Sequence, residues 1–259
     1  MAFGSALKVQ GREAAIWYGG LSLLTAQVLR NLTLPRGYWR LVAQEIDAIG
    51  ARSLMVAVTA AAFTGMVFTL QSAVNMARFG AENYVGAVVA LAILRELGPV
   101  LTAILVGGKV ASGITAELGA MKVTEQIDAL RTIGINYVKK LVVPRFLAAL
   151  MVFPLLTILA DAIGLLGGML IAVWERHVDP YVYWNAISNW VVLKDFLTGI
   201  AKSFFFAAIV TLIGCYNGLS TEGGTEGLGR ATTETVVQVT MAVIIADFFL
   251  TKLLLFLFW

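Results

Sequence analysis

The sequence predicts an all-α polytopic membrane protein, in which N-terminal helices at the membrane interface precede a bundle of transmembrane helices. Hydrophobic residues make up 59% of the 259 residues and charged residues only 14%, whereas about 25% of the residues in a soluble domain are charged. The mean hydropathy is correspondingly high, at +0.84. The apolar residues come in long blocks that do not alternate with polar ones, which indicates helices that cross a bilayer.

Five of these blocks reach the length of about 20 apolar residues that a helix needs to cross the hydrocarbon core. Residues 53–77 and 203–221 contain no charged residue, and residues 146–174 contain only Asp161. The predicted spans are residues 53–76, 84–110, 145–173, 196–218 and 232–257. Together they form a transmembrane domain over residues 53–259.

The first 52 residues have a different character and are predicted to form interfacial helices. Residues 14–29 are uncharged, but the block is short and is interrupted by Gly19-Gly20. Residues 37–52 form a second amphipathic segment, as expected for a helix that lies flat in the interface. Its apolar side consists of Trp39, Val42, Ile46 and Ile49. A short sixth span over residues 14–30 is the alternative.

The distribution of lysine and arginine predicts the orientation, because short cytoplasmic loops are enriched in these residues. Six precede the first span, namely Lys8, Arg12, Arg30, Arg36, Arg40 and Arg52. Five more follow the second span, namely Lys122, Arg131, Lys139, Lys140 and Arg145. The other loops carry only Arg78, Arg176 and Lys194. We therefore expect a cytoplasmic N-terminus, a cytoplasmic segment over 111–144 and an external C-terminus. This topology is sufficient to explain the net charge of +3, so no nucleic acid is expected as a partner.

No catalytic residue, metal site or cofactor is expected in this chain. The single cysteine, Cys215, excludes an internal disulfide. With one histidine, His177, in an outer loop, the usual ligands for a zinc site and the usual residues of a nucleophile triad are missing. The stretch around Lys109 resembles a phosphate loop, but Ala103 and Val110 stand where that motif requires glycine and serine or threonine. The glycine-rich residues 221–234 follow no strand and are predicted to form the cytoplasmic turn between the last two spans.

The loop between the second and third spans is predicted to contain an amphipathic helix. At helical spacing, Val123, Ile127 and Leu130 share one face, and polar residues occupy the rest. One interpretation is an interfacial helix that only joins two spans. The other is a docking helix whose charged face binds a soluble partner.

Several motifs in the chain resemble one family of membrane transport proteins. They are LRELGPV (94–100), TAELGAMKVTEQIDAL (115–130), VVPRFLA (142–148), GLLGG (164–168) and GLGRATTETVV (227–237). In combination they resemble the MlaE/YrbE permeases, the membrane subunits of ABC-type lipid transporters that work with MCE-domain proteins. The resemblance covers roughly residues 40–255.

This resemblance implies a homodimer in the bacterial inner membrane that moves phospholipid or a related lipid. Each copy would bind a cytoplasmic ATPase subunit, which holds the ATP and magnesium, through a coupling helix over residues 115–131. The candidate coupling residues are Glu117, Lys122, Glu125 and Asp128. A ring of MCE proteins would cover the outer face, and a small STAS-domain protein could bind the ATPase.

Arg95 and Glu96 lie near the middle of the second span, where a lone charge costs about 2.5–3.5 kcal/mol on insertion scales. In one interpretation they are structural and pair with residues of neighbouring helices. In the other they form a headgroup site, where the planar guanidinium of Arg95 binds a lipid phosphate. The family resemblance places this region near the substrate cavity and favours the headgroup site.

Other candidate substrate-site residues are predicted from their positions in the spans. Asp247 is expected to be the interior partner of a basic residue, with Arg95 as the candidate. Phe68, Met76 and Phe79 lie late in the first span or just after it, where they could line a pocket for an acyl chain. Aromatic residues and methionine at helical spacing also occur in ordinary packing.

Two other functions are compatible with the sequence. The first is an ion- or proton-coupled secondary transporter that uses Glu96, Asp161 and Asp247 as a relay. The second is a membrane scaffold without cargo.

A feature that departs from the expected family pattern is Glu234, since the resemblance implies a basic residue near this position.

Overall fold

The computed structural model describes residues 2–32 and 38–258, and these residues form helices without strands. Arg36, which contributed to the predicted orientation, lies outside them. Within the described residues, five helical segments are long and apolar enough to cross a membrane, namely Trp39–Ala77, Glu82–Val123, Val138–Trp174, Leu193–Leu219 and Gly224–Leu257. The prediction of an all-α polytopic fold with five spans is therefore confirmed.

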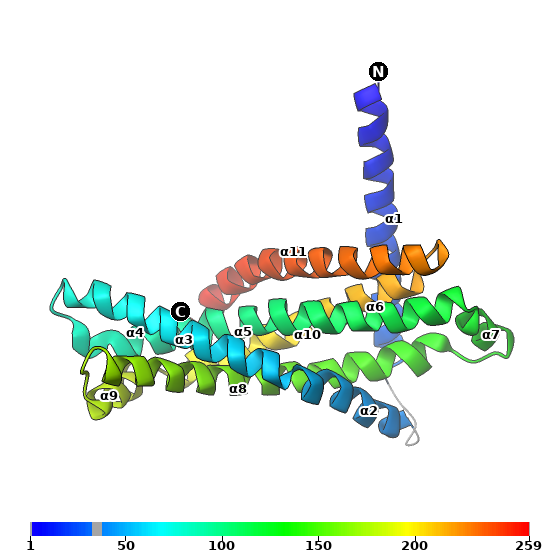
Figure 1. Cartoon of the computed structure of the whole chain (residues 1–259). Helices are drawn as coiled ribbons and strands as arrows, with labels where there is room; N and C mark the ends of the chain where they lie inside the picture. Colours follow the sequence, from blue (N-terminus) through cyan, green and yellow to red (C-terminus); the bar gives the residue numbers. More distant parts are fainter. Residues whose placement is uncertain (1, 33–37, 259) are drawn as a thin grey trace.

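The spans lie side by side along one long axis (Figure 1). Helix α3 (Leu54–Ala77) packs against α8 (Val143–Trp174), and α10 (Leu193–Leu219) packs against both α8 and α6 (Gly107–Val123). Helix α11 (Gly224–Phe258) covers α6 and α10 and leaves much of its apolar surface exposed. The main core forms where α6, α8 and α10 meet.

Small residues allow the spans to approach closely. A Cβ atom at Gly65 of α3 would lie 2.0 Å from the carbonyl oxygen of Gly164 on α8. Likewise, a Cβ at Gly218 of α10 would lie 2.8 Å from the side chain of Leu118 on α6. Backbone contact of this kind replaces the hydrophobic driving force that is missing between helices in lipid.

Helix α1 (Ala2–Arg30) is continuous, so the helix predicted over residues 14–29 forms and runs through Gly19-Gly20. Gly20 has a packing role, because a Cβ there would lie 2.3 Å from the hydroxyl of Tyr216 on α10. Helix α1 runs across the spans rather than along them (Figure 1). It is not among the five apolar spans, and its place at the membrane interface stays a prediction.

Helix α2 (Trp39–Gly50) forms within the predicted segment 37–52 and buries Val42 and Ile49 against α8. A 3-10 turn over Ala51–Ser53 leads directly into α3. The predicted boundary at residue 52 therefore coincides with this turn, within a continuous helical run.

Two predicted local structures are wrong. The amphipathic helix expected over 115–131 is divided between α6 and α7 (Gln126–Thr132), because Glu125 adopts a left-handed conformation with φ 58° between them. The turn expected over 221–234 is also shorter, since α11 begins at Gly224. Positive φ angles at Gly223 and Gly224, 86° and 67°, complete the chain reversal within a few residues.

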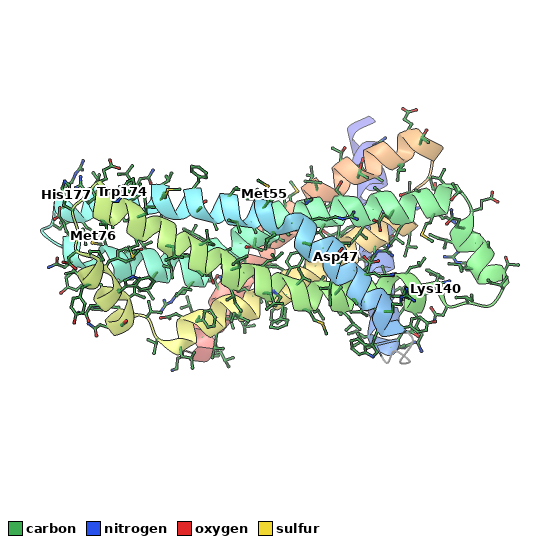
Figure 2. All side chains as sticks on the ribbon, turned by 60° about the horizontal axis from the view of Figure 1, so that its bottom comes forward. Asp47, Met55, Met76, Lys140, Trp174 and His177 are labelled. Carbon is green, nitrogen blue, oxygen red and sulfur yellow. The ribbon has the colours of Figure 1, made fainter. Side chains whose placement is uncertain are left out.

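The two ends of the bundle differ in the segments that they carry. Figure 2 places Lys140 at the end where α7 lies and His177 at the opposite end. Helix α9 (Pro180–Trp190), capped by the carboxylate of Asp179, belongs to the His177 end. This separation is the one that the predicted topology requires, because the basic loop and the loop containing His177 must face opposite sides of the membrane.

Candidate functional site

The second span is irregular where the two central charges lie. After α4 (Val85–Ala92), residues Ile93–Leu97 form a π-helical turn, followed by the short helix α5 (Gly98–Leu101) and a second π-helical turn over Thr102–Val106. In the π pattern the carbonyl of Leu94 would accept from residue 99, but Pro99 has no N–H to donate. The local sequence thus leaves this carbonyl without its helical partner.

Helix α10 packs directly onto this π-helical turn. A Cβ at Gly199 would lie 2.0 Å from the carbonyl oxygen of Leu94, so only glycine permits this approach. Asp195, Gly199 and Lys202 are spaced four and three residues apart and therefore share one face of α10. This face meets three consecutive residues of the second span. Gly199 lies against Leu94. Asp195 contacts Arg95, and Lys202 contacts Glu96.

Arg95 forms a salt bridge with Asp195. Its Nη2 and Nε atoms lie 2.5 and 2.8 Å from Oδ1 of the aspartate. The other carboxylate oxygen, Oδ2, accepts the backbone N–H of Val192 at 2.9 Å, which holds the aspartate at the start of α10. Asp195 is buried, whereas 29% of the Arg95 side chain is exposed. The aspartate therefore fixes an arginine side chain that remains partly exposed.

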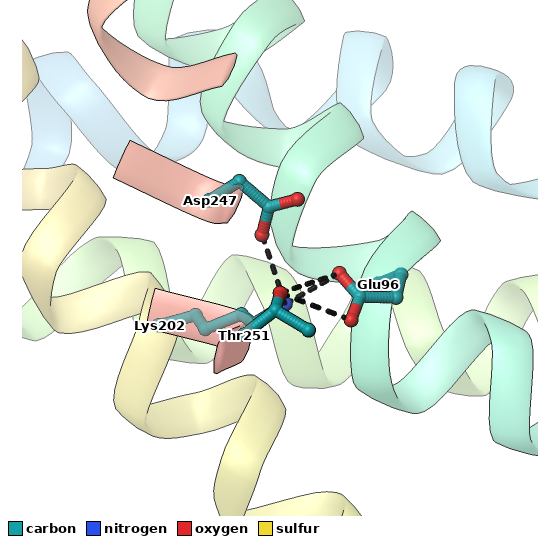
Figure 3. Close-up of polar contacts among 4 residues, drawn as sticks. All are labelled: Glu96, Lys202, Asp247 and Thr251. Carbon is teal, nitrogen blue, oxygen red and sulfur yellow. Dashed lines mark hydrogen bonds and ion pairs between the residues drawn. The ribbon is translucent and has the colours of Figure 1, made fainter. Parts of the chain in front are cut away.

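Glu96, Lys202, Asp247 and Thr251 form a second polar group, here called the Lys202 cluster (Figure 3). The ammonium of Lys202 donates to the carboxylate of Glu96, to Asp247 Oδ1 at 2.8 Å and to Thr251 Oγ1 at 2.6 Å. Thr251 also contacts Glu96 Oε1, at 3.2 Å. The Lys202 side chain is completely buried, and these three contacts match the three donors of an ammonium group. The cluster links the π-helical turn to α10 and α11.

A groove of about 320 Å³ opens beside both polar groups. Its polar surface is formed by Arg95, Glu96, Thr198 and Thr251. Its apolar surface is formed by Leu91, Ala92, Leu254 and Leu255. An amphiphile with a charged head and an apolar chain matches this combination of residues.

The comparisons with known proteins agree with the membrane fold. A family model described as Permease MlaE matches residues 42–253. The chain belongs to the MlaE permease family. The matched region contains the Arg95–Asp195 pair and the Lys202 cluster, and it leaves out helix α1.

Named relatives cover most of the chain. It is 39% identical over 220 residues to the intermembrane phospholipid transport system permease protein MlaE of Haemophilus influenzae, which covers 85% of this chain and 84% of that protein. It is 37% identical over 243 residues to a probable ABC transporter permease protein of Synechocystis, covering 93% and 92%. It is also 33% identical over 238 residues to the chloroplast protein TRIGALACTOSYLDIACYLGLYCEROL 1 of Arabidopsis thaliana, covering 92% and 68%.

The ion pairs of this MlaE permease differ from those predicted from its sequence. Arg95 pairs with Asp195, and Asp247 pairs with Lys202, so the predicted partnership of Arg95 with Asp247 is wrong. Sequence reasoning missed Asp195 and Lys202. A signal was present, because Lys202 lies inside the predicted fourth span and Asp195 lies seven residues before it, on the same helical face.

The predicted acyl-chain residues do not meet in one groove. Phe68 and Met76 pack against the cluster that contains Val85 and Val89, and Phe68 also lines a separate groove of about 340 Å³. Phe79 is exposed beyond the end of α3. Their role in lipid binding stays a prediction.

Asp161 is buried on α8 and lies apart from the Lys202 cluster. Its Oδ1 atom has no hydrogen-bond partner among the described residues and lies against Gly98, where a Cβ would be only 1.7 Å away. Glu96 and Asp247 are joined through Lys202, whereas no described hydrogen bond extends this path to Asp161.

The predicted coupling residues lie at the α7 end of the bundle. Glu117 forms an ion pair with the buried Arg145, at 2.8 Å. Lys122 and Asp128 pair with each other at 2.8 Å and so connect α6 to α7. The hydrogen bond from Lys122 lowers the pKa of the Asp128 carboxyl. Glu125 is exposed in the turn between the two helices.

Residues 2–32 and 38–258 contain no group of three or more histidine, cysteine, aspartate or glutamate side chains that could hold a metal ion. The charged groups of the candidate site are instead arranged as ion pairs beside an apolar groove.

Proposed function

We propose that this protein is the permease subunit of an ABC transporter that moves phospholipid, or a related lipid, between the cytoplasmic membrane and an MCE-protein conduit. The observation that carries the proposal is the partly exposed side chain of Arg95, which lines an apolar groove inside a five-span permease. The names of two relatives support it, a phospholipid transport permease in Haemophilus and a probable ABC transporter permease in Synechocystis.

In this proposal Arg95 binds the phosphate of the lipid. A guanidinium group offers planar, charge-assisted hydrogen bonds that suit phosphate oxygens. The salt bridge to Asp195 holds the side chain in place before the lipid arrives, so less conformational entropy is lost on binding. The leucine side chains of the groove then contact the acyl chains.

The Lys202 cluster has a different role in the proposal. Because Lys202 is completely enclosed by its partners, it holds the second, fourth and fifth spans together and does not contact the lipid. The side chain of Glu96 is 40% exposed and lines the groove. Its carboxylate can therefore orient the headgroup while it stays bonded to Lys202. In this proposal Arg95 has the headgroup role, Lys202 has the structural role, and Glu96 contributes to both.

ATP hydrolysis takes place in a separate ATPase subunit in this proposal. The cytoplasmic α7 end of the bundle, with Glu117, Lys122, Glu125 and Asp128, forms the docking region, while the exposed apolar face of α11 meets a second copy or lipid. The MCE ring covers the α9 end, and a STAS-domain protein binds the ATPase. This arrangement places the N-terminus in the cytoplasm and the C-terminus outside.

The proposal is tested by measuring the phospholipid that co-purifies with the chain. Arg95→Met is combined with Asp195→Asn, because the single change would leave the buried carboxylate of Asp195 without its ion pair. The double variant removes both charges, so it should insert and fold, and it should lower the bound phospholipid several-fold. Arg176→Met is the matched control, because Arg176 forms only a distant pair with Glu82, at 3.9 Å. Equal lipid content in the two well-folded variants would overturn the headgroup role of Arg95.

A proton-coupled secondary transporter remains the second candidate, favoured by the carboxylates of Glu96 and Asp247 that share one buried lysine. Transport assays separate the two functions. Lipid movement that follows an imposed proton gradient without ATP would favour the secondary transporter, whereas movement that requires ATP and the ATPase subunit supports the ABC permease.

A further inference from the structure

Two adjoining grooves run between α1, α10 and α11, away from the groove at Arg95. The first, of about 660 Å³, lies at the α7 end, and the second, of about 700 Å³, continues from it along the spans. Both grooves are lined by Trp17, Glu234 and Gln238, so they form one continuous depression. None of their lining residues belongs to the Arg95 groove.

The two parts of this depression differ in polarity. The part at the α7 end contains Glu222, Glu226 and Arg230. The inner part contains apolar side chains, among them Leu21 of α1, Leu212 of α10, and Met241 and Ile245 of α11. A change from charged to apolar along the direction of the spans is the order in which a leaflet presents headgroups and acyl chains to a protein.

Hydrogen bonds hold the walls of the depression in place. Trp17 Nε1 donates to Asn217 Oδ1 at 3.0 Å, and Asn217 Nδ2 donates to Gln238 Oε1 at 2.8 Å and to Thr235 Oγ1 at 2.8 Å. The ring of Trp17 also packs edge-on against Tyr216, with the centroids 5.9 Å apart. Side-chain hydrogen bonds through Asn217 therefore link α1, α10 and α11 along the wall of the depression.

We propose that this depression binds a phospholipid with an amine-bearing zwitterionic headgroup, such as phosphatidylethanolamine, at a site separate from the Arg95 groove. The acyl chain occupies the inner part beside Met241 and Ile245. Arg230, which is held by Glu234 at 2.7 Å, meets the phosphate, and Glu222 and Glu226 meet the ammonium group. A headgroup with net negative charge is disfavoured, because the polar part carries three carboxylates and one guanidinium.

The site is tested with the full chain in nanodiscs that contain a phosphatidylethanolamine analogue with a photoreactive diazirine in its acyl chain. Mass spectrometry should locate the adducts on the facing residues of α1, α10 and α11. Ile245→Trp fills the inner part and should lower this labelling several-fold. Ile244→Trp is the matched control, because Ile244 is similarly exposed, at 54% against 59%, but does not line the depression. Equal labelling in the two variants would overturn the site.

Competition experiments test the headgroup. Unlabelled phosphatidylethanolamine should displace the probe better than phosphatidylglycerol, and Glu226→Gln should reduce this preference. Equal displacement by both lipids would overturn the headgroup assignment.

A disulfide between two copies that carry Met241→Cys, formed in the bilayer, would overturn the proposal in favour of a dimer contact. Labelling requires no transport, so its failure would leave the function proposed for Arg95 unaffected.

Discussion

Replacing Lys202 by methionine removes the cation that two carboxylates share in the interior of the bundle. The lysine side chain is completely buried, whereas Glu96 and Asp247 retain 40% and 22% exposure. Breaking a buried ion pair by removing one partner costs about 3–5 kcal/mol, because the other charge is left without compensation. Water can reach Glu96 in the groove, so Asp247 bears most of the penalty, and we expect a loss near the lower end, about 3 kcal/mol.

The double variant Lys202→Met with Asp247→Asn separates this mechanism from a simple loss of packing. It removes the carboxylate that the single change leaves behind, so it should recover more than half of the lost stability. The free energy of unfolding is measured in mixed micelles of mild detergent and dodecyl sulfate. Lys252→Met on the exposed surface of α11 is the control and should stay within about 0.5 kcal/mol of the unmodified protein. A single variant of undiminished stability, or a double variant no more stable than the single one, would refute the reasoning.

Three further predictions concern packing, pH and topology. Gly199→Ala should force α10 away from the π-helical turn and destabilise the bundle by about 1–3 kcal/mol. Gly113→Ala is the control and should not destabilise it, because no atom lies within 4 Å of a Cβ at Gly113. Equal unfolding curves for the two variants would contradict this. Because the pKa of Asp128 is lowered, its ion pair stabilises α7 at pH values above the ordinary carboxyl value of 3.8 and is lost as pH falls through the depressed value. Hydrogen exchange of α7, corrected for its intrinsic rate, should therefore rise only at that acidic pH. Exchange that rises near neutral pH would contradict this. Cysteine at Tyr137 should react with impermeant reagents only from the cytoplasm and cysteine at Pro180 only from outside, and the opposite labelling would reverse the topology.

The spans were predictable because each transmembrane helix satisfies its own backbone hydrogen bonds. Its existence therefore depends on a local run of apolar residues, and blocks such as 53–76 and 145–173 reveal it directly. The interruption of the helix at Glu125 was not predictable from the apolar pattern, since Val123, Ile127 and Leu130 keep helical spacing across it.

The site was predictable only in part. The central position of Arg95 and Glu96 in an apolar run identified two of its residues, but their partners depend on which face of the fourth span meets the second. The π-helical turn also changes the hydrogen-bond pattern from i+4 to i+5, so an ideal helical wheel misplaces the side chains beyond it. The pairing of Asp247 with Lys202 follows from this tertiary arrangement, which apolar periodicity does not contain.

In the proposed function this permease moves phospholipid in an ATP-dependent complex, and Arg95 binds the lipid headgroup. The most direct measurement is ATP-driven transfer of a labelled phospholipid by proteoliposomes that contain the chain with its co-purified ATPase and MCE partners. We expect transfer that requires ATP, is strongly reduced when Arg95→Met is combined with Asp195→Asn, and is unchanged by Arg176→Met. Transfer at the original rate in the double variant, or without ATP, would contradict the proposed function.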